Sequence, residues 1–555
     1  MDDELHLLMT CADERAPLLP EGIDGESSQA GAHEAQALPE YLWDEGGDPN
    51  DLELQRWGVF APEGDRGERL LALVRPLIER REAQQGAPVQ VYRVPGAMTA
   101  LEAARWNKRV FQSADLDDDD RPRYQLMLGD LHELPLALQQ RQASDGFVGR
   151  LAFDRDDDYA AYVAKLLASE DATPTHDLAT TMFHTVHDGT GATRLGHRAL
   201  VEPGLEHMRK RLALGKLSTR ELLACGDEFD PSPDELLQFA AIDHPAVMFS
   251  LSHGDGPPRR GWGSAEQQRA RQGAMSFGRA GSIEGTTLSD AKFLPGGLWF
   301  MLACYGAGTP DASAYQHWLA ELKQLGQFRG KAEAVLAGIP AAGERPFIAA
   351  VPKATLASEH GPLAFVGHVD LAWSYSFQEL DDGPMNRPSK FTGVLRSALR
   401  RDRMGISFRE LYKYLGQTES ELASIYDQGA RGGEVDLARR GHLWMLRQDL
   451  SAYVLLGDPA ARLCVRGGRA ASQQQVSTPV SAQNFLGFPV AQSTETHGAA
   501  LPLKIDELEE AIAKVILGDE SAKAIARAYD VDRHELQELA DAYQAAGRAA
   551  LRGRS

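Results

Sequence analysis

Two apolar runs decide the fold of this chain, and each leads directly into a reactive side chain. They are VMFSLSHGDG at positions 247–256 and LWFMLACYGAG at positions 298–308. Runs in which nearly every residue is apolar are typical of central strands in a parallel sheet, because both faces of such a strand are buried. We therefore expect His253 and Cys304 to lie beyond the carboxyl ends of two core strands.

Strand and helix patterns alternate on either side of this pair of runs. Expected strands lie at 57–61, 89–94, 124–128, 147–153, 347–351 and 363–366, and expected helices include 66–81, 101–111 and 159–167. Strands separated by helices imply crossover connections and a mostly parallel sheet with helices on both faces. The sequence therefore predicts an α/β fold, followed by mainly helical chain from 385 to 465 that includes a helix at 443–455.

Composition divides the chain into five parts. They are an irregular acidic leader (1–52), an α/β domain (53–385), a helical segment packed on it (386–466), a flexible linker (467–501) and a three-helix module (502–555). The linker is identified by its Ser, Gln, Thr, Gly and Pro content. The last part has the pattern of a helix-turn-helix unit.

Charge and cysteine content exclude several classes of function. The 555 residues include 58 Lys and Arg against 80 Asp and Glu, for a net charge of −22. This acidic balance argues against general binding of nucleic acid, which needs clustered positive charge. The 4 cysteines are too scattered for a disulfide framework or a cysteine-based zinc site. There is no secretory signal pattern and no apolar run of transmembrane length, so we expect a cytoplasmic protein without membrane contact.

The two reactive side chains form a plausible nucleophile and base. A thiol at Cys304 needs a base to raise its thiolate fraction, and an imidazole at His253 can supply one. The backbone N–H groups of Gly254 and Cys304 are candidates for stabilising an oxyanion. A lone strand cysteine is usually core, and a lone histidine before glycine is often part of a turn. Their joint placement, 51 residues apart at the ends of two apolar strands, favours catalysis.

Further strings in the same order resemble a known family. YQLMLGDLHELP at 124–135, GRLAFD at 149–154, SHG at 252–254 with GWG at 261–263, and FVGHVDLAWSYS at 365–376 are similar to motifs of the caspase-like (clan CD) cysteine peptidases, especially the gingipain type. The resemblance covers about residues 55–385. It implies a caspase/gingipain-like sheet and a bacterial cysteine endopeptidase that acts on protein substrates without a metal or cofactor.

The resemblance also implies a pocket for the residue before the scissile bond. Trp373 would form one wall of it. The acidic insertion that selects basic residues in gingipains is absent here, which leaves Asp145 nearby and Asp370 or Asp255 as substitutes. The alternative for these two residues is a loop cap or a solvated charge. Gingipains also carry secretory and pro-segments that this chain lacks, so we expect a regulated intracellular processing protease, with a role in bacterial defence or cell death as a hypothesis.

Three alternatives remain open. The string His184-x-x-His187-Asp188 suggests a metal, although strand spacing places its histidines on opposite faces and no further ligand completes the set. The fold could also serve as a non-catalytic scaffold. The terminal module resembles transposase helix-turn-helix units, but residues 501–555 hold 8 basic and 11 acidic residues, so a protein partner is favoured over DNA.

Overall fold

The computed structural model describes residues 4–20, 22–24, 48–113, 116–227, 229–327, 332–340, 343–377 and 388–467. The chain divides into two units, Met1–Ser477 and Thr478–Ser555, and every described residue belongs to the first. The expected linker beyond residue 467 and the expected module at 502–555 therefore lie outside the described residues, as does most of the 1–52 leader.

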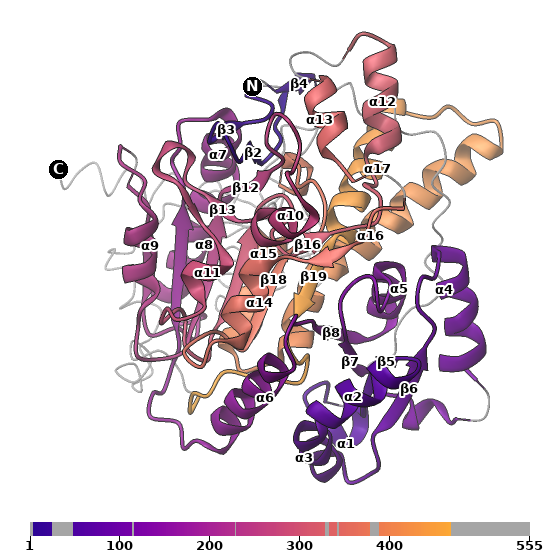
Figure 1. Ribbon diagram of the computed structural model, residues 1–555, viewed down its shortest axis with the longest axis vertical. Coiled ribbons are helices and arrows are strands. Elements are labelled where there is room, and N and C mark those ends of the chain that lie inside the picture. Colours follow the sequence, from indigo (N-terminus) through magenta and orange to yellow (C-terminus); the bar gives the residue numbers. More distant parts are fainter. Residues whose placement is uncertain are drawn as a thin grey trace, which may run out of the picture. The chain divides into compact units, whose positions relative to one another are not determined.

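A ten-stranded sheet forms the centre of the first unit (Figure 1). Across the sheet the strands are β10 (Leu222–Cys225), β9 (Thr180–Thr185), β11 (Ala246–Leu251), β15 (Leu298–Leu302), β18 (Ala364–His368), β19 (Tyr453–Leu456), β8 (Phe147–Leu151), β7 (Tyr124–Leu128), β5 (Trp57–Pro62) and β6 (Gln90–Val94). Neighbours are parallel except at β18 and β19, which are antiparallel. The sheet thus consists of two parallel halves that run in opposite directions.

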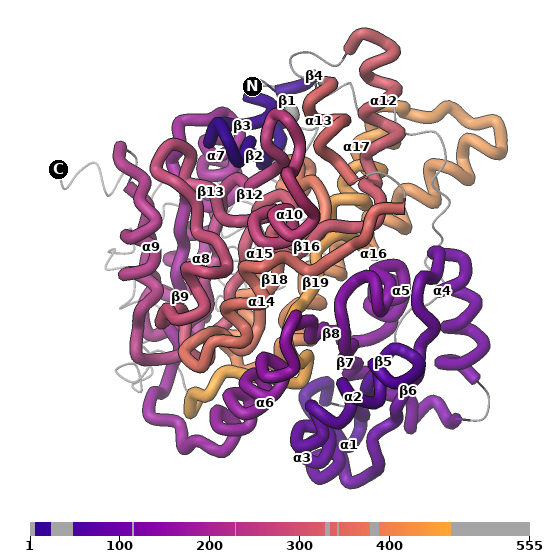
Figure 2. Tube along the Cα trace, in the orientation of Figure 1, coloured from indigo at the N-terminus to yellow at the C-terminus, as the bar shows by residue number. Residues whose placement is uncertain are grey.

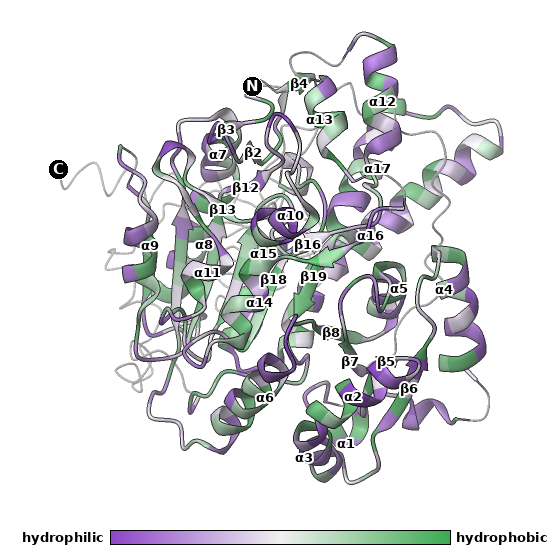
Figure 3. Cartoon of the chain, in the orientation of Figure 1, coloured by the Kyte–Doolittle hydropathy of each residue, from purple (hydrophilic) through white to green (hydrophobic). Residues whose placement is uncertain are grey.

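The central strands are the apolar runs of the sequence. Every residue of β11, β15 and β18 is buried, as expected for strands that are covered on both faces. Figure 3 shows the hydrophobic colour along these strands, whereas outer helices such as α4 and α12 alternate between hydrophobic and hydrophilic residues. The mixed α/β architecture predicted from the sequence is confirmed for this unit.

Helices pack against the sheet and connect its strands; α15 contacts β11, and α16 contacts β8. The α-helices are α1 (Leu52–Gln55), α2 (Asp65–Leu73), α3 (Arg75–Gln85), α4 (Ala100–Trp106), α5 (Leu136–Asp145), α6 (Asp156–Asp171), α7 (Gly191–Gly196), α8 (Glu202–Ala213), α9 (Pro233–Ala240), α10 (Ala265–Arg271), α11 (Gly285–Leu288), α12 (Gln316–Gln324), α13 (Ala332–Gly338), α14 (Ala350–Ala357), α15 (Ser389–Leu399), α16 (Met404–Ala430) and α17 (Leu437–Ser451). Among the described helices, none combines the length and apolarity needed to cross a membrane.

Two expected elements differ from the structure. The expected core strand at 347–351 is wrong: only Phe347–Ile348 (β17) is extended, it pairs with β16 (Gly308–Thr309) outside the main sheet, and α14 begins at Ala350. The expected helix at 443–455 ends at Ser451, and Tyr453–Leu456 forms β19. Both errors have the same cause, since a short apolar run does not distinguish a buried helix from a buried strand.

A second, five-stranded sheet lies against the carboxyl end of β11. Its order is β14 (Ser282–Ile283), β13 (Met275–Ser276), β12 (His253–Gly256), β2 (Met9–Cys11) and β3 (Ala16–Pro17). Two further short strands, β1 (Glu4–Leu5) and β4 (Ile23–Asp24), pair with each other. Part of the leader that the sequence predicts to be irregular is thus built into a sheet that contains His253.

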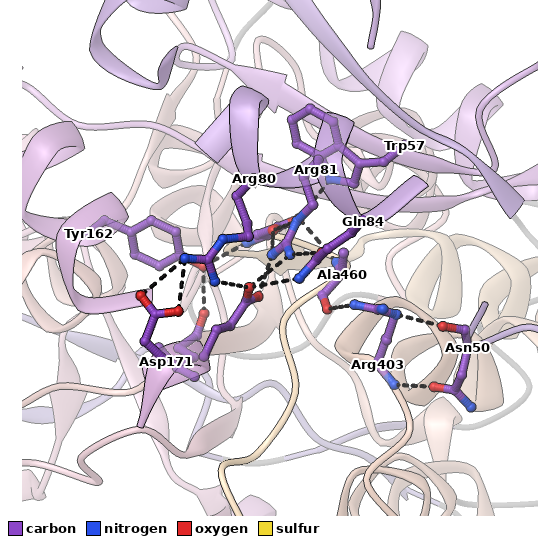
Figure 4. A network of polar contacts seen from close by, with 12 residues as sticks. Asn50, Trp57, Arg80, Arg81, Gln84, Tyr162, Asp171, Arg403 and Ala460 are labelled. Carbon is purple, nitrogen blue, oxygen red and sulfur yellow. Dashed lines mark hydrogen bonds and ion pairs between the residues drawn. The ribbon is translucent and has the colours of Figure 1, made fainter. Parts of the chain in front are cut away.

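A buried polar network joins three segments that are distant in the sequence (Figure 4). The guanidinium of Arg81 lies 2.6 Å from the carboxylate of Asp458, with both side chains fully buried, and it also pairs with Glu170 at 2.6 Å. The Trp57 indole N–H donates to the other Asp458 oxygen at 3.0 Å. The chain just after β19 is thereby fixed to α3, β5 and α6.

Candidate active site

The register between β11 and β15 brings His253 and Cys304 to the same edge of the main sheet. Leu251 pairs with Leu302, so the residues two positions farther along each strand lie at the same level. A Cβ atom added at Gly254 would lie 1.9 Å from the carbonyl oxygen of Cys304. This close approach of the two backbones requires glycine at position 254, and it places Gly254 directly against Cys304.

The imidazole of His253 is fully buried and has two polar neighbours on one nitrogen. Its Nε2 lies 3.0 Å from the hydroxyl of Thr190 and 3.6 Å from a carboxylate oxygen of Asp188. Burial lowers the pKa of His253, and Asp188 and the backbone of Leu8 partly offset this by raising it. The carboxylate thus favours the imidazolium form that a general base adopts after it takes a proton.

Asp188 itself is fixed by the turn that follows β9. One of its oxygens accepts hydrogen bonds from the Thr190 backbone N–H at 3.1 Å and from the Thr193 hydroxyl at 2.7 Å. Because β9 is the neighbour of β11 on the side away from β15, three adjacent strands each deliver one residue to the same edge. From the sequence, Asp188 is identified only within a possible metal string; its position shortly after β9 is the signal that could have found it.

The thiol of Cys304 is fully buried beside the loop that follows β18. The Ala372 backbone N–H donates to its sulfur at 3.2 Å. Burial raises the pKa of the thiol well above its usual value, although the Ala372 backbone lowers it in part. The next residue, Tyr305, has a φ of +57°, which is a strained conformation for a non-glycine residue. The chain therefore turns sharply immediately after the candidate nucleophile.

Two backbone N–H groups converge on one oxygen atom next to this thiol. Gly254 and Cys304 both donate to the carbonyl oxygen of Leu8, at 3.0 Å and 3.2 Å. A pair of preorganised N–H donors about 3 Å from a single oxygen is the geometry that stabilises a developing oxyanion. Both donors are predicted from the sequence, but the residue whose carbonyl they bind is not.

Trp373 follows Ala372, whose backbone N–H donates to the sulfur of Cys304. It is buried, packs against Trp318 and Tyr315 with ring centroids 5.2 Å and 6.0 Å away, and forms an isolated antiparallel bridge with Leu7. Its neighbour Ala372 contacts the sulfur of Cys304. Through its bridge to Leu7, Trp373 lies next to the first residues of the described chain.

The carboxylate of Asp370 is held by hydrogen bonds from two segments, its own loop and residues 313–314. It accepts hydrogen bonds from the Ser313 hydroxyl and from the backbone N–H groups of Ala314 and Leu371, each at 2.8 Å. Burial raises its pKa to about 6, although these hydrogen bonds lower it in part. Its backbone carbonyl accepts from the N–H of Tyr305 at 2.9 Å, so Asp370 supports the turn that follows Cys304.

The other two acidic candidates occupy different positions. Asp255 is buried and accepts from the hydroxyls of Thr10 and Ser282, both at 2.9 Å. Asp145 lies 4.0 Å from Arg141 and lines a cavity of about 650 Å³ that Asp370 also borders. Neither His253 nor Cys304 lines that cavity. The structure thus places Gly254 against Cys304, and Ala372, the neighbour of Trp373, against its sulfur, with His253 next to Gly254; Asp145 lies at the separate cavity.

Within the described part of the chain, no group of three or more His, Cys, Asp and Glu side chains is arranged to hold a metal ion. His184 is buried, and burial lowers its pKa to about 4. His187 stacks edge-on against His197, with ring centroids 4.7 Å apart. The histidines of the possible metal string therefore lie in different surroundings, one buried in β9 and one packed against a neighbouring imidazole.

Comparison with known proteins adds a likeness to a class of solved structures. No family model matches the chain, and no curated protein matches its sequence. The chain is similar to the crystal structure of the Arg-specific cysteine proteinase gingipain R, with a TM-score of 0.42 and 12% identity over 76% of this chain and 80% of that chain.

Two further solved structures are similar over comparable spans. One is described as a protease, with a TM-score of 0.40, 11% identity and coverage of 75% of this chain and 79% of that chain. The other is the complex of the Porphyromonas gingivalis RgpB pro- and mature domains, with a TM-score of 0.40, 10% identity and coverage of 74% and 79%. These values describe a distant likeness in how the chain is arranged.

Proposed function

We propose that this chain is a cysteine endopeptidase that hydrolyses protein substrates through His253 and Cys304. The observation that carries the proposal is the convergence of the Gly254 and Cys304 N–H groups on one carbonyl oxygen beside a thiol. An acyl-transfer site needs a nucleophile, a base and donors for the oxyanion in one place. The pairing of β12 with β2 accounts for the Gly254 hydrogen bond, whereas the second donor, Cys304, lies outside that pair of strands.

The proposed reaction follows from these positions. His253 takes the proton of Cys304, and the thiolate attacks the carbonyl carbon of the substrate. The Gly254 and Cys304 N–H groups stabilise the oxyanion, and the imidazolium, facing Asp188, gives its proton to the leaving amine. Water then attacks the thioester with His253 as the base, which releases the acid product and restores the thiol.

The cellular part of the proposal is a regulated intracellular processing protease of a bacterium, with defence or cell death as its setting. The acidic composition supports a protein substrate over a nucleic acid. Residues 502–555, which lie outside the described residues, are proposed to bind a protein partner. A non-catalytic scaffold is the rival function, and the following experiment separates the two.

The test is cleavage of an unfolded protein mixture by the full chain and by the variants Cys304→Ala and His253→Ala. We expect each variant to lose at least about 1,000-fold of the rate, because removal of either member of such a pair disables the same step. Cys464→Ala and His317→Ala are matched controls, since Cys464 is partly exposed and His317 is mostly exposed. Full activity in either site variant would refute the dyad.

A further inference from the structure

A segment of the chain itself occupies the candidate site. The carbonyl oxygen of Leu8 accepts from Gly254 and Cys304, and the N–H of Leu8 donates to the carbonyl of Ala372 at 3.4 Å. Leu7 bridges Trp373 in antiparallel pairing on one side of Leu8. Figure 2 shows the indigo start of the chain alongside β12.

On the other side of Leu8 the segment continues as β2. This strand pairs in parallel with β12, so that Met9 lies opposite Gly254 and residue 11 lies opposite Gly256. The Thr10 hydroxyl donates to the Asp255 carboxylate at 2.9 Å. Residues 7–11 are all buried, which means that the segment fills the site rather than lying over it.

This arrangement matches what acyl transfer requires of a peptide substrate. The carbonyl to be attacked must lie at the oxyanion donors, and the flanking backbone must be held extended on both sides. The Leu8 carbonyl meets the first condition. The bridge of Leu7 to Trp373 and the pairing of Met9 with Gly254 meet the second.

We propose that residues Leu7–Cys11 occupy the substrate cleft as an internal substrate mimic that keeps the peptidase latent, with Leu8 in the place of the residue before the scissile bond. The proposal rests on the peptidase function proposed above, and it names the class of substrate. Protein substrates would present a leucine-sized apolar residue at this position, because Leu8 is 1% exposed and belongs to the main hydrophobic cluster.

The acidic residues around the site fit an apolar residue better than a basic one. The Asp370 oxygens are engaged by Ser313, Ala314 and Leu371, and those of Asp255 are engaged by Thr10 and Ser282. Asp145 borders a separate cavity. An arginine side chain at the position of Leu8 would therefore lack a free carboxylate, and burial of an unpaired charge is costly.

Several contacts explain how the segment persists beside the nucleophile without being released. Besides the pairing of β2 with β12 and β3, the Glu14 carboxylate forms an ion pair with Arg259. If the Leu8–Met9 bond were attacked, the leaving amine of Met9 would stay next to the acyl group. Proximity of this kind strongly favours re-formation of the bond.

The test measures access to Cys304 in the full chain. Purified wild type and Leu8→Asp are incubated with peptidyl acyloxymethyl ketones that carry Leu, Arg or Asp at the reacting position, and mass spectrometry locates the adduct. A carboxylate at position 8 is disfavoured in the apolar site, so the segment should leave it. We expect labelling of Cys304 to rise at least about 10-fold, with the Leu probe reacting fastest.

Two further variants test the interpretation. Leu54→Asp is the matched control, because Leu54 is 53% exposed, and its labelling should equal that of wild type. Thr10→Val removes the hydrogen bond to Asp255 without adding charge, and it should raise labelling about 5-fold even if Leu8→Asp fails to fold. Circular dichroism shows which variants retain the fold.

The outcomes separate this inference from the proposed function. No adduct on Cys304 with any probe, in folded wild type and in folded variants alike, would refute the peptidase itself. Equal labelling of Cys304 in wild type, Thr10→Val and Leu8→Asp would refute the internal mimic and leave the peptidase standing. Fastest reaction with the Arg or Asp probe would likewise overturn the assignment of an apolar residue.

Discussion

The carboxylate of Asp188 divides its two oxygens between two tasks. One oxygen accepts hydrogen bonds from Thr190 and Thr193, which fixes the side chain in its turn, and the other faces Nε2 of His253 at 3.6 Å. A carboxylate in this place orients the imidazole and stabilises its charged form. We therefore regard Asp188 as a positioning residue that acts through His253.

The variant Asp188→Asn tests this role through the pH profile. Without the negative charge the imidazolium is less stable, so the pKa of His253 falls and the acidic limb of the pH–rate profile should move to lower pH. We expect kcat to fall about 100-fold in the same variant. Asp290→Asn changes an exposed carboxylate and should leave both quantities unaltered. A lower rate with an unshifted limb would indicate a purely structural role.

Gly254 has the tightest requirement of the site glycines, since an added Cβ would lie 1.9 Å from a carbonyl oxygen. Gly254→Ala should lower the free energy of unfolding by more than about 2 kcal/mol, because backbone cannot move aside as a side chain can. Gly416→Ala is the contrasting change: nothing lies within 4 Å in the middle of α16, and a gain of about 0.5–1 kcal/mol is expected. Urea denaturation of both variants measures the difference, and equal effects would contradict it.

At the scale of elements, the sequence predicts the core strands well because nearly all of their residues are apolar. The apolar runs at 246–251 and 298–303 form β11 and β15, and their ends place His253 and Cys304 together. The composition of a strand does not show which other strands it pairs with. The position of β9 beside β11, which brings in Asp188, depends on the order of strands in the sheet, and the sequence does not state that order.

The segment that carries Leu8 illustrates a second limit. Its strands are only two or three residues long, and they form because β12 and Trp373 offer unpaired backbone groups. Short stretches that fold against another element carry little periodicity of their own. An analysis of local pattern therefore predicts irregular chain for residues that lie in the candidate site. The expected helix at 443–455 is wrong over Tyr453–Leu455 for a related reason, since these residues pair with β18.

At the scale of the whole unit, the buried pair of Arg81 and Asp458 joins α3 to the chain just after β19, 377 positions away in the sequence. Asp458→Ala would leave the Arg81 guanidinium buried with Glu170 as its remaining carboxylate, and the Trp57 indole N–H would lose its acceptor. Loss of one partner of a buried pair costs about 3–5 kcal/mol.

Thermal and urea denaturation of Asp458→Ala should therefore show a loss of that size. Glu79→Ala provides the comparison, because its pair with Arg75 is exposed on α3 and should contribute little to stability. A small effect of Asp458→Ala, close to that of Glu79→Ala, would contradict the importance assigned to the network.

The placement of β19 has a consequence for how the protein is made. This strand is the last of the sheet to be synthesised, yet it lies in the middle and joins the two halves. Until residue 456 has left the ribosome, β18 and β8 each present an open edge. A nascent chain therefore has no closed sheet before that point, and the proposed peptidase would become active only after it.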